Sequence, residues 1–275
     1  MPTVQRAGID IHYEVTGEGP PVLLAHSLLC SGEVWRNQVP ALARRHRVVN
    51  VDARGHGRSS RATARFTLYD SVADHLAVLD ALGIERAVWA GLSQGGMVAL
   101  RAALDHPDRV GALVLLGADA GPETPRRRVE EALLGVVARA FGLRPAIPLI
   151  AKAMFGRTTR RENRALAAEW SRRFAAADVP SALHSLHAVN RRDDLLPRLR
   201  ISAPTLVLVG DEDEAQLPSR SRRLSAAIPG ARLVEIPRAG HLSPLEQPEA
   251  VTAELVGFLE GLGRGAQAAP APAPA

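Results

Sequence analysis

Several residue types are scarce in this sequence, and each shortage excludes a class of protein. The 275 residues include one cysteine, Cys30, so the chain cannot close an internal disulfide, which fits a reducing cytoplasm. No uninterrupted apolar run approaches the ~20 residues that a membrane-spanning helix requires. Residues 1–19 lack the apolar core that follows the basic start of a signal peptide. We therefore expect a cytoplasmic protein that does not enter a membrane.

Lysine and aromatic residues are also rare, which bears on nucleic-acid binding. The formal net charge is +5, yet Lys152 is the only lysine and aromatic residues make up 4% of the chain. The arginines are scattered, whereas a nucleic-acid interface needs basic residues gathered on one face and interleaved with aromatics. We interpret the excess of arginine as a coding bias and expect no nucleic-acid partner.

The glycine motifs that hold phosphates are missing as well, but a different glycine motif is present. No G-x-G-x-x-G follows a strand-like run, and no glycine loop ends in Gly-Lys-Ser/Thr. Instead, an apolar run breaks at Gly91, passes through Ser93 and resumes beyond Gly95 as a helix-forming sequence. Glycines two places on either side of a serine let the backbone turn sharply from strand to helix, because a Cβ there would collide across the bend.

This bend predicts a reactive position for the Ser93 hydroxyl. It places the hydroxyl at a helix N-terminus, where amide N–H groups point outward without partners. A nucleophile that forms a tetrahedral oxyanion needs such donors beside it. The alternative interpretation is a glycine-rich turn that contains a serine by chance.

Short apolar runs alternate with helical spacing along most of the chain. Residues 4–6 and 9–15 predict a hairpin, and residues 69–82 predict a helix with Asp70 or Ser71 near its N-cap. Further strands are expected at 21–25, 48–51, 87–91, 109–116, 204–210 and 232–236, and helices at 35–44, 94–104, 219–227 and 248–262. This rhythm predicts the α/β class, with a mostly parallel sheet, helices on both faces and right-handed crossovers.

The rhythm stops between two of the predicted strands. Residues 123–198 show helical patterns and no convincing strand, with helices expected at 128–141, 146–155, 161–176 and 180–189. We expect residues 1–121 and 199–262 to form the core domain and residues 122–198 to form an inserted helical cap. The Ala/Pro-rich residues 263–275 predict a disordered tail.

Two late loops offer the groups that a serine nucleophile needs. A serine hydroxyl requires an imidazole to accept its proton, and the imidazole requires an orienting carboxylate. Residues 210–214 supply acidic side chains after one predicted strand, and residues 237–242 supply His241 after the next. In an open parallel sheet both loops lie at the carboxyl edge, where ligands bind.

The motifs together identify a known family. The sequence resembles the α/β-hydrolases, from Val4 to about Gly261. The matching stretches are His26–Leu29, Asp52–Ser59, Gly91–Gly96, His106–Val110, Gly210–Asp213 and Ala239–His241. Residues 35–42 and the elbow are most similar to the enol-lactonase-like (3-oxoadipate) and carboxylesterase branches.

The resemblance implies a catalytic triad. Position by position, it makes Ser93 the nucleophile, His241 the general base and Asp213 the acid. Asp211 lies too near the strand end in that pattern, and Asp119 is the acid that some relatives use instead. A surface histidine is the alternative interpretation of His241.

The resemblance also implies an oxyanion hole made by two backbone amides. These amides are those of Gln94, directly after the nucleophile, and of Leu28 in the loop after the strand at 21–25. Ser27 stands where this loop usually has glycine, and the enol-lactonase branch tolerates a serine at that place. His26, His56 and Arg54 are expected to be structural, and Cys30 is expected to line the pocket.

The expected reaction is the hydrolysis of a small-molecule ester or lactone through an acyl-enzyme. No cofactor or metal is expected, because no Cys/His cluster has the spacing of ligands. The same triad serves carbon–carbon bond hydrolases, cofactor-free haloperoxidases or perhydrolases, and acyltransferases, which stay open. A ligand-binding member without catalysis is the alternative of another class, and a homo-oligomer also stays open.

Arginines concentrate in the predicted cap and give two hypotheses. Most should form a solvated helix face, but one of them could enter the pocket and pair with a substrate carboxylate. The candidates are Arg126, Arg127, Arg128, Arg157, Arg160, Arg161, Arg172 and Arg173. Trp170 and Phe174, four residues apart, are expected either to roof the pocket or to pack the cap.

Overall fold

The computed structural model describes residues 2–267, apart from the side chains of 127, 131 and 265–267, and contains one eight-stranded sheet. The strand order is β1-β2-β4-β3-β5-β6-β7-β8. β1 and β2 pair antiparallel, β2 joins β4 antiparallel, and the strands from β4 to β8 run parallel. The strands are β1 (Thr3–Arg6), β2 (Ile9–Thr16), β3 (Pro21–Ala25), β4 (Arg47–Val51), β5 (Ala87–Leu92), β6 (Val110–Leu116), β7 (Thr205–Gly210) and β8 (Arg232–Ile236). The predicted α/β class, with its mostly parallel sheet, is confirmed.

The sheet is covered on both faces, as its continuously apolar strands require. Along β6, Leu113 and Leu115 join one core cluster, while Val114 and Leu116 join the other. This alternation follows from the two-residue period of a strand. The first cluster contains the helices α2 (Leu68–Ala81), α3 (Gln94–Asp105) and α9 (Pro218–Ala227), and the second contains α1 (Val39–Leu42), α10 (Ser243–Glu246) and α11 (Pro248–Gln267).

Two helix starts differ from the prediction for local reasons. α2 begins after Thr67, whose hydroxyl caps the amide of Asp70 while the Asp70 carboxylate accepts from the Thr67 amide. Asp70 is therefore the third residue of a capping box and not the cap itself. The helix predicted at 35–44 is instead a 3-10 turn, η1 (Gly32–Trp35), followed by the short α1, which has Pro40 in its first turn.

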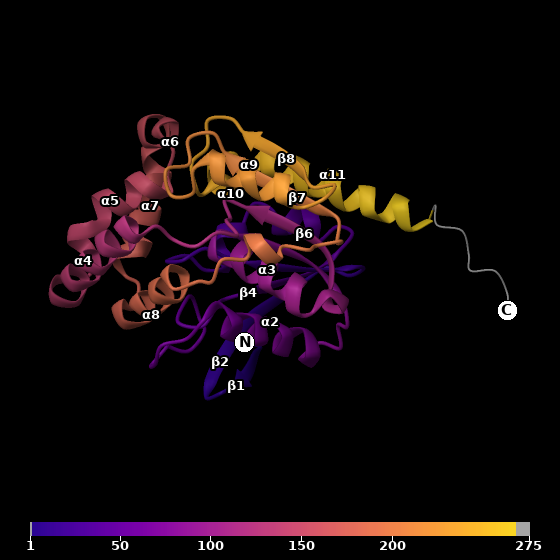
Figure 1. Ribbon diagram of the computed structural model, residues 1–275, viewed down its shortest axis with the longest axis horizontal. Coiled ribbons are helices and arrows are strands. Elements are labelled where there is room, and N and C mark those ends of the chain that lie inside the picture. The colour runs from indigo at the N-terminus through magenta and orange to yellow at the C-terminus, as the bar shows by residue number, and fades with distance from the viewer. Residues whose placement is uncertain (1, 268–275) are drawn as a thin grey trace.

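Five helices stand between β6 and β7 and lie together at one side of the sheet (Figure 1). They are α4 (Pro125–Phe141), α5 (Ile147–Met154), α6 (Arg157–Glu162), α7 (Arg164–Ala175) and α8 (Val179–Asn190). We call this helical segment the cap. The single helix predicted at 161–176 is divided, because the Asn163 side chain accepts from the Leu166 amide at 3.2 Å and starts α7 anew.

The C-terminal helix is longer than predicted. α11 continues to Gln267, so the prediction of a disordered tail from residue 263 is wrong for residues 263–267. No proline interrupts these residues, since the Ala/Pro repeat begins with Pro270. The rest of the predicted tail, 268–275, lies outside the described residues. Among the helices of the described residues, none is long and apolar enough to cross a membrane.

Candidate active site

Ser93 occupies a strained turn between β5 and α3. Its backbone has φ 54° and ψ −110°, a left-handed conformation that costs free energy in a non-glycine residue. Its amide donates to the Leu116 carbonyl of β6 at 2.7 Å, which fixes the turn to the neighbouring strand. A Cβ on Gly91 would collide with the backbone of Gly95, and one on Gly95 would collide with Ala25. The predicted collision across the bend is confirmed for Gly91, whereas a Cβ on Gly95 would meet the neighbouring strand β3 instead.

Asp213 and His241 form a buried pair beyond the ends of β7 and β8. His241 Nδ1 lies 2.8 Å from Asp213 Oδ2, and both side chains are almost fully buried. The other carboxylate oxygen, Oδ1, accepts from the amides of Ala215 and Gln216 at 2.9 and 2.8 Å. Because both oxygens of the carboxylate act as acceptors, His241 donates from Nδ1. This tautomer leaves Nε2 with a free lone pair, the state that a general base requires.

Gly117 is part of this arrangement, although the sequence analysis did not single it out. It follows β6 directly and has φ +49°. A Cβ at this position would lie 3.1 Å from both Asp213 Oδ2 and His241 Nδ1. Only glycine leaves the carboxylate–imidazole pair undisturbed. A glycine directly after a buried parallel strand is the sequence signal that could have found it.

The other two candidate acids lie elsewhere. Asp211 is exposed, while its amide donates to the Ile236 carbonyl. Asp119 is buried among arginines: its carboxylate accepts from Arg223 at 2.9 Å and from Arg220 at 3.3 Å. Of the three acids, Asp213 alone contacts His241 in the described part of the chain.

A cavity of about 360 Å³ connects Ser93 and His241 with the cap. Its floor is the loop of Ser27, Leu28 and Leu29. Its cap side is mainly apolar and includes Leu134, Ile150, Met154, Leu183, Leu186 and Val189. A volume of this size accommodates a small ligand.

The predicted oxyanion hole concerns the backbone amides of Gln94 and Leu28. Gln94 is the first residue of α3, so its amide has no acceptor within the helix. The Ser27 carbonyl accepts from the Cys30 amide at 3.1 Å, and this turn places the Leu28 amide at its corner beside the cavity. The Gln94 side chain is held in turn by α8, since its Oε1 accepts from the Ser185 hydroxyl at 2.9 Å.

The neighbouring histidine and arginine side chains have structural contacts. His26 Nε2 accepts from the Ala53 amide at 2.9 Å and Nδ1 donates to the Ser27 carbonyl, so the ring joins two loops. Burial lowers the pKa of His26, and that of His56 to about 4, which keeps both rings neutral at pH 7. Arg54 makes two 2.6 Å bonds to Asp74.

Cys30 does not line the cavity, contrary to the prediction. Its side chain is buried in the second core cluster with Val34 and Trp35. Burial raises the pKa of the Cys30 thiol, because the charged thiolate is disfavoured there. The thiol is therefore a packing group and not a reactive one.

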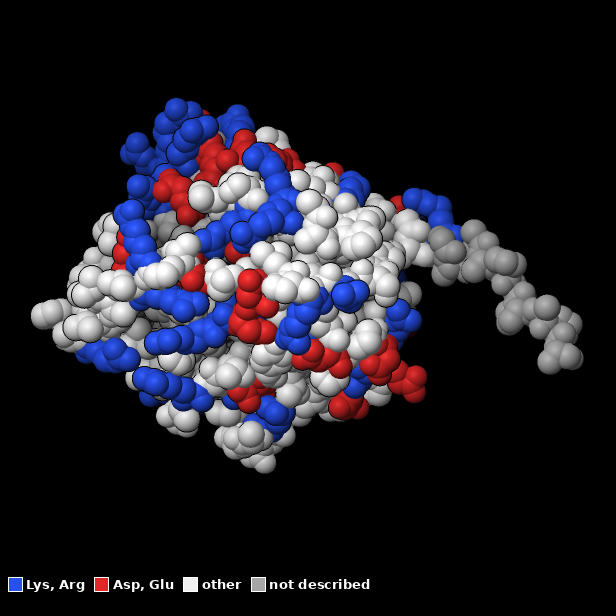
Figure 2. Space-filling view, viewed as in Figure 1, with Lys and Arg blue, Asp and Glu red and all other residues white. Residues whose placement is uncertain are grey.

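Most of the candidate cap arginines are exposed, whereas Arg128 and Arg160 are half-buried. Basic side chains gather over the cap at the left of Figure 2. Apart from Arg127, whose side chain lies outside the described part, none of the candidate arginines lines the cavity beside Ser93. The hypothesis that one of them enters the pocket is therefore wrong for all the described candidates. Most are paired with acids: Arg126 with Glu130, Arg157 with Glu212, Arg160 with Glu214, Arg161 with Glu162 and Arg173 with Glu169. Trp170 and Phe174 pack the cap, with ring centroids 6.1 Å apart.

Comparisons with known proteins agree with this architecture. The family described as "alpha/beta hydrolase fold" matches residues 20–248. RutD of Caulobacter vibrioides, which carries the name of a carbamate hydrolase, is 34% identical over 91% of this chain and 96% of its own. A thermophilic esterase from Thermogutta terrifontis superposes with a TM-score of 0.88 at 29% identity, covering 94% of this chain and 98% of that one. The enol-lactonase from Burkholderia xenovorans LB400 superposes with a TM-score of 0.87 at 30% identity, covering 94% and 100%.

Proposed function

The chain belongs to the α/β-hydrolase fold family, and from this premise we propose that it is a serine hydrolase that cleaves small carboxylic esters or lactones through an acyl-enzyme. One observation carries the proposal. The imidazole of His241 is 2.8 Å from the buried Asp213 carboxylate, and it lines the same cavity as Ser93 on its strained turn. The esterase and the enol-lactonase that share this fold support the choice of substrate class.

The first half of the reaction forms the acyl-enzyme. Ser93 Oγ attacks the carbonyl carbon while His241 Nε2 accepts the hydroxyl proton. Asp213 holds the imidazole in the required tautomer and stabilises the imidazolium. The amides of Leu28 and Gln94 donate to the oxyanion. The imidazolium then returns its proton to the leaving alkoxide as the tetrahedral intermediate collapses.

The second half of the reaction releases the acid. His241 removes a proton from water, which attacks the acyl carbonyl, and the same amides stabilise the second oxyanion. Transfer of the proton to Ser93 Oγ restores the free enzyme. Each step uses only side chains and amides of this chain and a water molecule.

The cavity favours an uncharged, apolar acyl group. Its cap side is built from aliphatic side chains, and Glu123 and Glu130 are acids in its lining. No arginine or lysine of the described residues lines it. An anionic acyl group would be desolvated there without a cationic partner. We propose neutral acyl esters as the preferred substrates.

Hydrolysis of p-nitrophenyl butyrate tests the proposed nucleophile. Ser93→Ala should lower kcat at least a thousandfold, because the covalent route is lost. Ser221→Ala is the matched control, since Ser221 is buried in α9 outside the cavity, and it should retain wild-type activity. Undiminished turnover by pure Ser93→Ala protein would contradict the proposal.

The alternative chemistries of this triad differ in the acyl acceptor or in the bond that is cleaved. Product analysis separates them: hydrolysis gives the free acid, hydrogen peroxide as acceptor gives a peracid, and an added alcohol gives a new ester. A dienone that is cleaved between carbon atoms would identify a carbon–carbon bond hydrolase. Tight binding without turnover across the whole panel would identify a ligand-binding member.

A further inference from the structure

The cap contains a second cavity, of about 300 Å³, in the groove between α4 and α8. From α4 it is lined by residues 128, 132, 135, 136 and 139, a spacing that puts all five on one helix face. From α8 it is lined by residues 183, 186, 187 and 190, and Arg191 directly after the helix lines it as well. Leu183 and Leu186 also line the cavity beside Ser93, so these two side chains are shared by both cavities.

Three arginines around this groove have no acidic partner. Arg128, Arg139 and Arg191 make no side-chain ion pair with any residue whose side chain the structure describes, whereas most other cap arginines are paired. Three unpaired guanidinium groups beside one cavity form a positive site that attracts an anion.

Buried polar atoms in the same groove also lack partners. Asn190 is 9% exposed, and its Oδ1 has no hydrogen-bond partner within the described chain. The same is true of Arg128 Nε. A buried polar atom without a partner costs about 1–3 kcal/mol, so an anion that accepts from Arg128 Nε gains affinity. Asn190 Oδ1 is itself an acceptor and needs a donor, so an anionic oxygen does not satisfy it.

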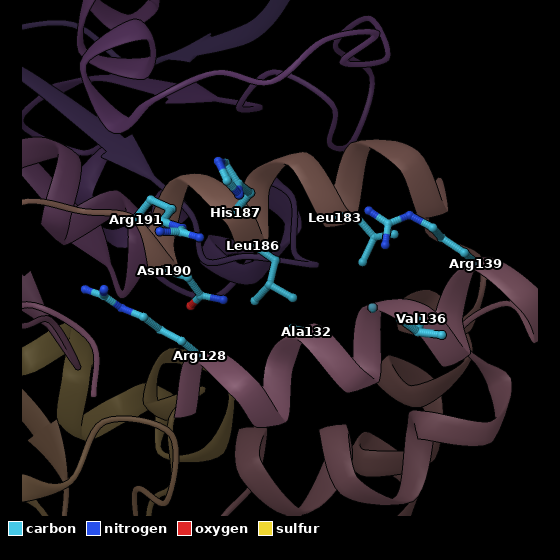
Figure 3. Close-up of a pocket in the computed structure, with 10 residues that line it drawn as sticks. Arg128, Ala132, Val136, Arg139, Leu183, Leu186, His187, Asn190 and Arg191 are labelled. Carbon is cyan, nitrogen blue, oxygen red and sulfur yellow. The ribbon is translucent and has the colours of Figure 1, made fainter. Parts of the chain in front are cut away.

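The side chains divide the groove into polar ends and an apolar middle (Figure 3). Arg128 and Arg191 lie on either side of Asn190 at one end, while Arg139 extends from α4 toward α8 at the other. Leu186 points into the space between the two helices. This arrangement matches a molecule with an anionic head and a short apolar chain.

We propose that this groove binds an amphipathic anion, a carboxylate or phosphate group on an aliphatic chain. The guanidinium groups of Arg128 and Arg191 donate to the anionic head, and the chain lies on Leu186 and Leu183. The site is distinct from the Ser93 cavity, which has no described arginine in its lining. Since the groove and the active-site cavity share two leucines, a bound chain contacts the side chains that also border the acyl group.

Calorimetric titration of the wild-type protein tests the ligand class with four probes. Octanoate and octyl phosphate carry both the head and the chain, 1-octanol lacks the charge, and inorganic phosphate lacks the chain. We expect at least one amphipathic anion to bind tenfold or more tightly than 1-octanol and inorganic phosphate. The tighter of the two anions identifies the head group, and equal affinity assigns the site to both. If neither anion binds tenfold more tightly than both 1-octanol and inorganic phosphate, the proposal is overturned.

A pair of double variants tests the location with the tighter probe. Arg128→Gln/Arg191→Gln should weaken its binding at least tenfold. Arg164→Gln/Arg172→Gln is the matched control, because it removes the same charge from exposed positions of α7. It should change the affinity for the probe less than twofold. Equal weakening in both pairs, or none in either, would overturn the proposal. If the probe binds in the active-site cavity instead, neither double variant should change its affinity. The comparison of the four probes uses the wild-type protein alone and does not depend on whether a variant folds.

Discussion

At the scale of single residues, the site depends on backbone positions where only a small side chain fits. Gly91 and Gly95 permit the turn at Ser93, and Gly117 permits the close approach of Asp213 and His241. Ser93 itself has positive φ, a strain that the surrounding strand and helix sustain. The conformation of the turn at Ser93 and the contact between Asp213 and His241 therefore depend on the backbone at these positions.

Gly117→Ala tests this dependence. The added methyl group would press on both His241 Nδ1 and Asp213 Oδ2, so we expect kcat for p-nitrophenyl butyrate to fall at least tenfold with a smaller change in KM. Gly83→Ala is the matched control, because Gly83 also has positive φ (+65°) but nothing lies within 4 Å of its added Cβ. Both variants should lose about 1 kcal/mol of stability, and only the first should lose activity. Equal activities of the two would contradict the role assigned to Gly117.

At the scale of elements, the cap is fastened to the core by buried ion pairs. Glu123 precedes α4, Arg192 follows α8 and Arg220 lies in α9. The Glu123 carboxylate accepts from Arg192 at 3.3 Å and from Arg220 at 3.0 Å. Burial alone would raise the pKa of Glu123, but hydrogen bonds from Arg220 and from the Thr124 amide lower it to about 2. The two ends of the cap are thus joined to α9 by one carboxylate.

Glu123→Gln should destabilise the protein by about 3 kcal/mol at pH 7, because it removes one of the two buried carboxylates, Glu123 and Asp119, that balance the charges of Arg192 and Arg220. Since the folded-state pKa is depressed, this stabilisation is complete above the ordinary value of 4.5 and is lost as the pH falls toward 2. Urea unfolding at pH 7, 4 and 3 should show that the difference in the free energy of unfolding between the wild type and the variant becomes smaller as the pH falls. Glu260→Gln, which removes an exposed pair with Arg45, should have little effect at any of these pH values. A gap that stayed constant with pH would contradict the assignment.

At the scale of the whole molecule, the arginines of the cap and the cavity beside Ser93 lie apart. Basic side chains gather on the outside of the cap (Figure 2). The cavity beside Ser93 is lined mainly by aliphatic groups and two acids. The abundance of arginine in the cap therefore does not make the acyl site cationic.

This separation predicts a preference between matched esters. p-Nitrophenyl hexanoate and mono-p-nitrophenyl adipate have the same chain length and leaving group and differ in the terminal carboxylate. We expect kcat/KM to be at least tenfold higher for the hexanoate, because the cavity offers the carboxylate no described cation. Rates with Ser93→Ala protein give the background to subtract. A preference for the adipate would show that a cation enters the site.

The sequence by itself determined the order of the elements and the candidates for the site. Apolar runs of strand length, helical spacing and the glycines around Ser93 are local signals, and local chain geometry dictates their meaning. The same signals predicted single helices at 35–44 and 161–176, and both predictions were wrong. Pro40 lies in the first turn of α1 and Asn163 caps the start of α7, so each helix begins anew at these positions.

Only the tertiary structure decided which side chains meet. The family resemblance implied Asp213 as the acid and left Asp119 as an alternative, and the contact itself comes from strand order and loop conformation, which bring Asp213 within 2.8 Å of His241. The exposure of most candidate cap arginines, the burial of Cys30 and the closeness of Gly117 to the imidazole likewise depend on packing between elements. Such contacts join distant parts of the chain, and a single sequence carries no direct record of them.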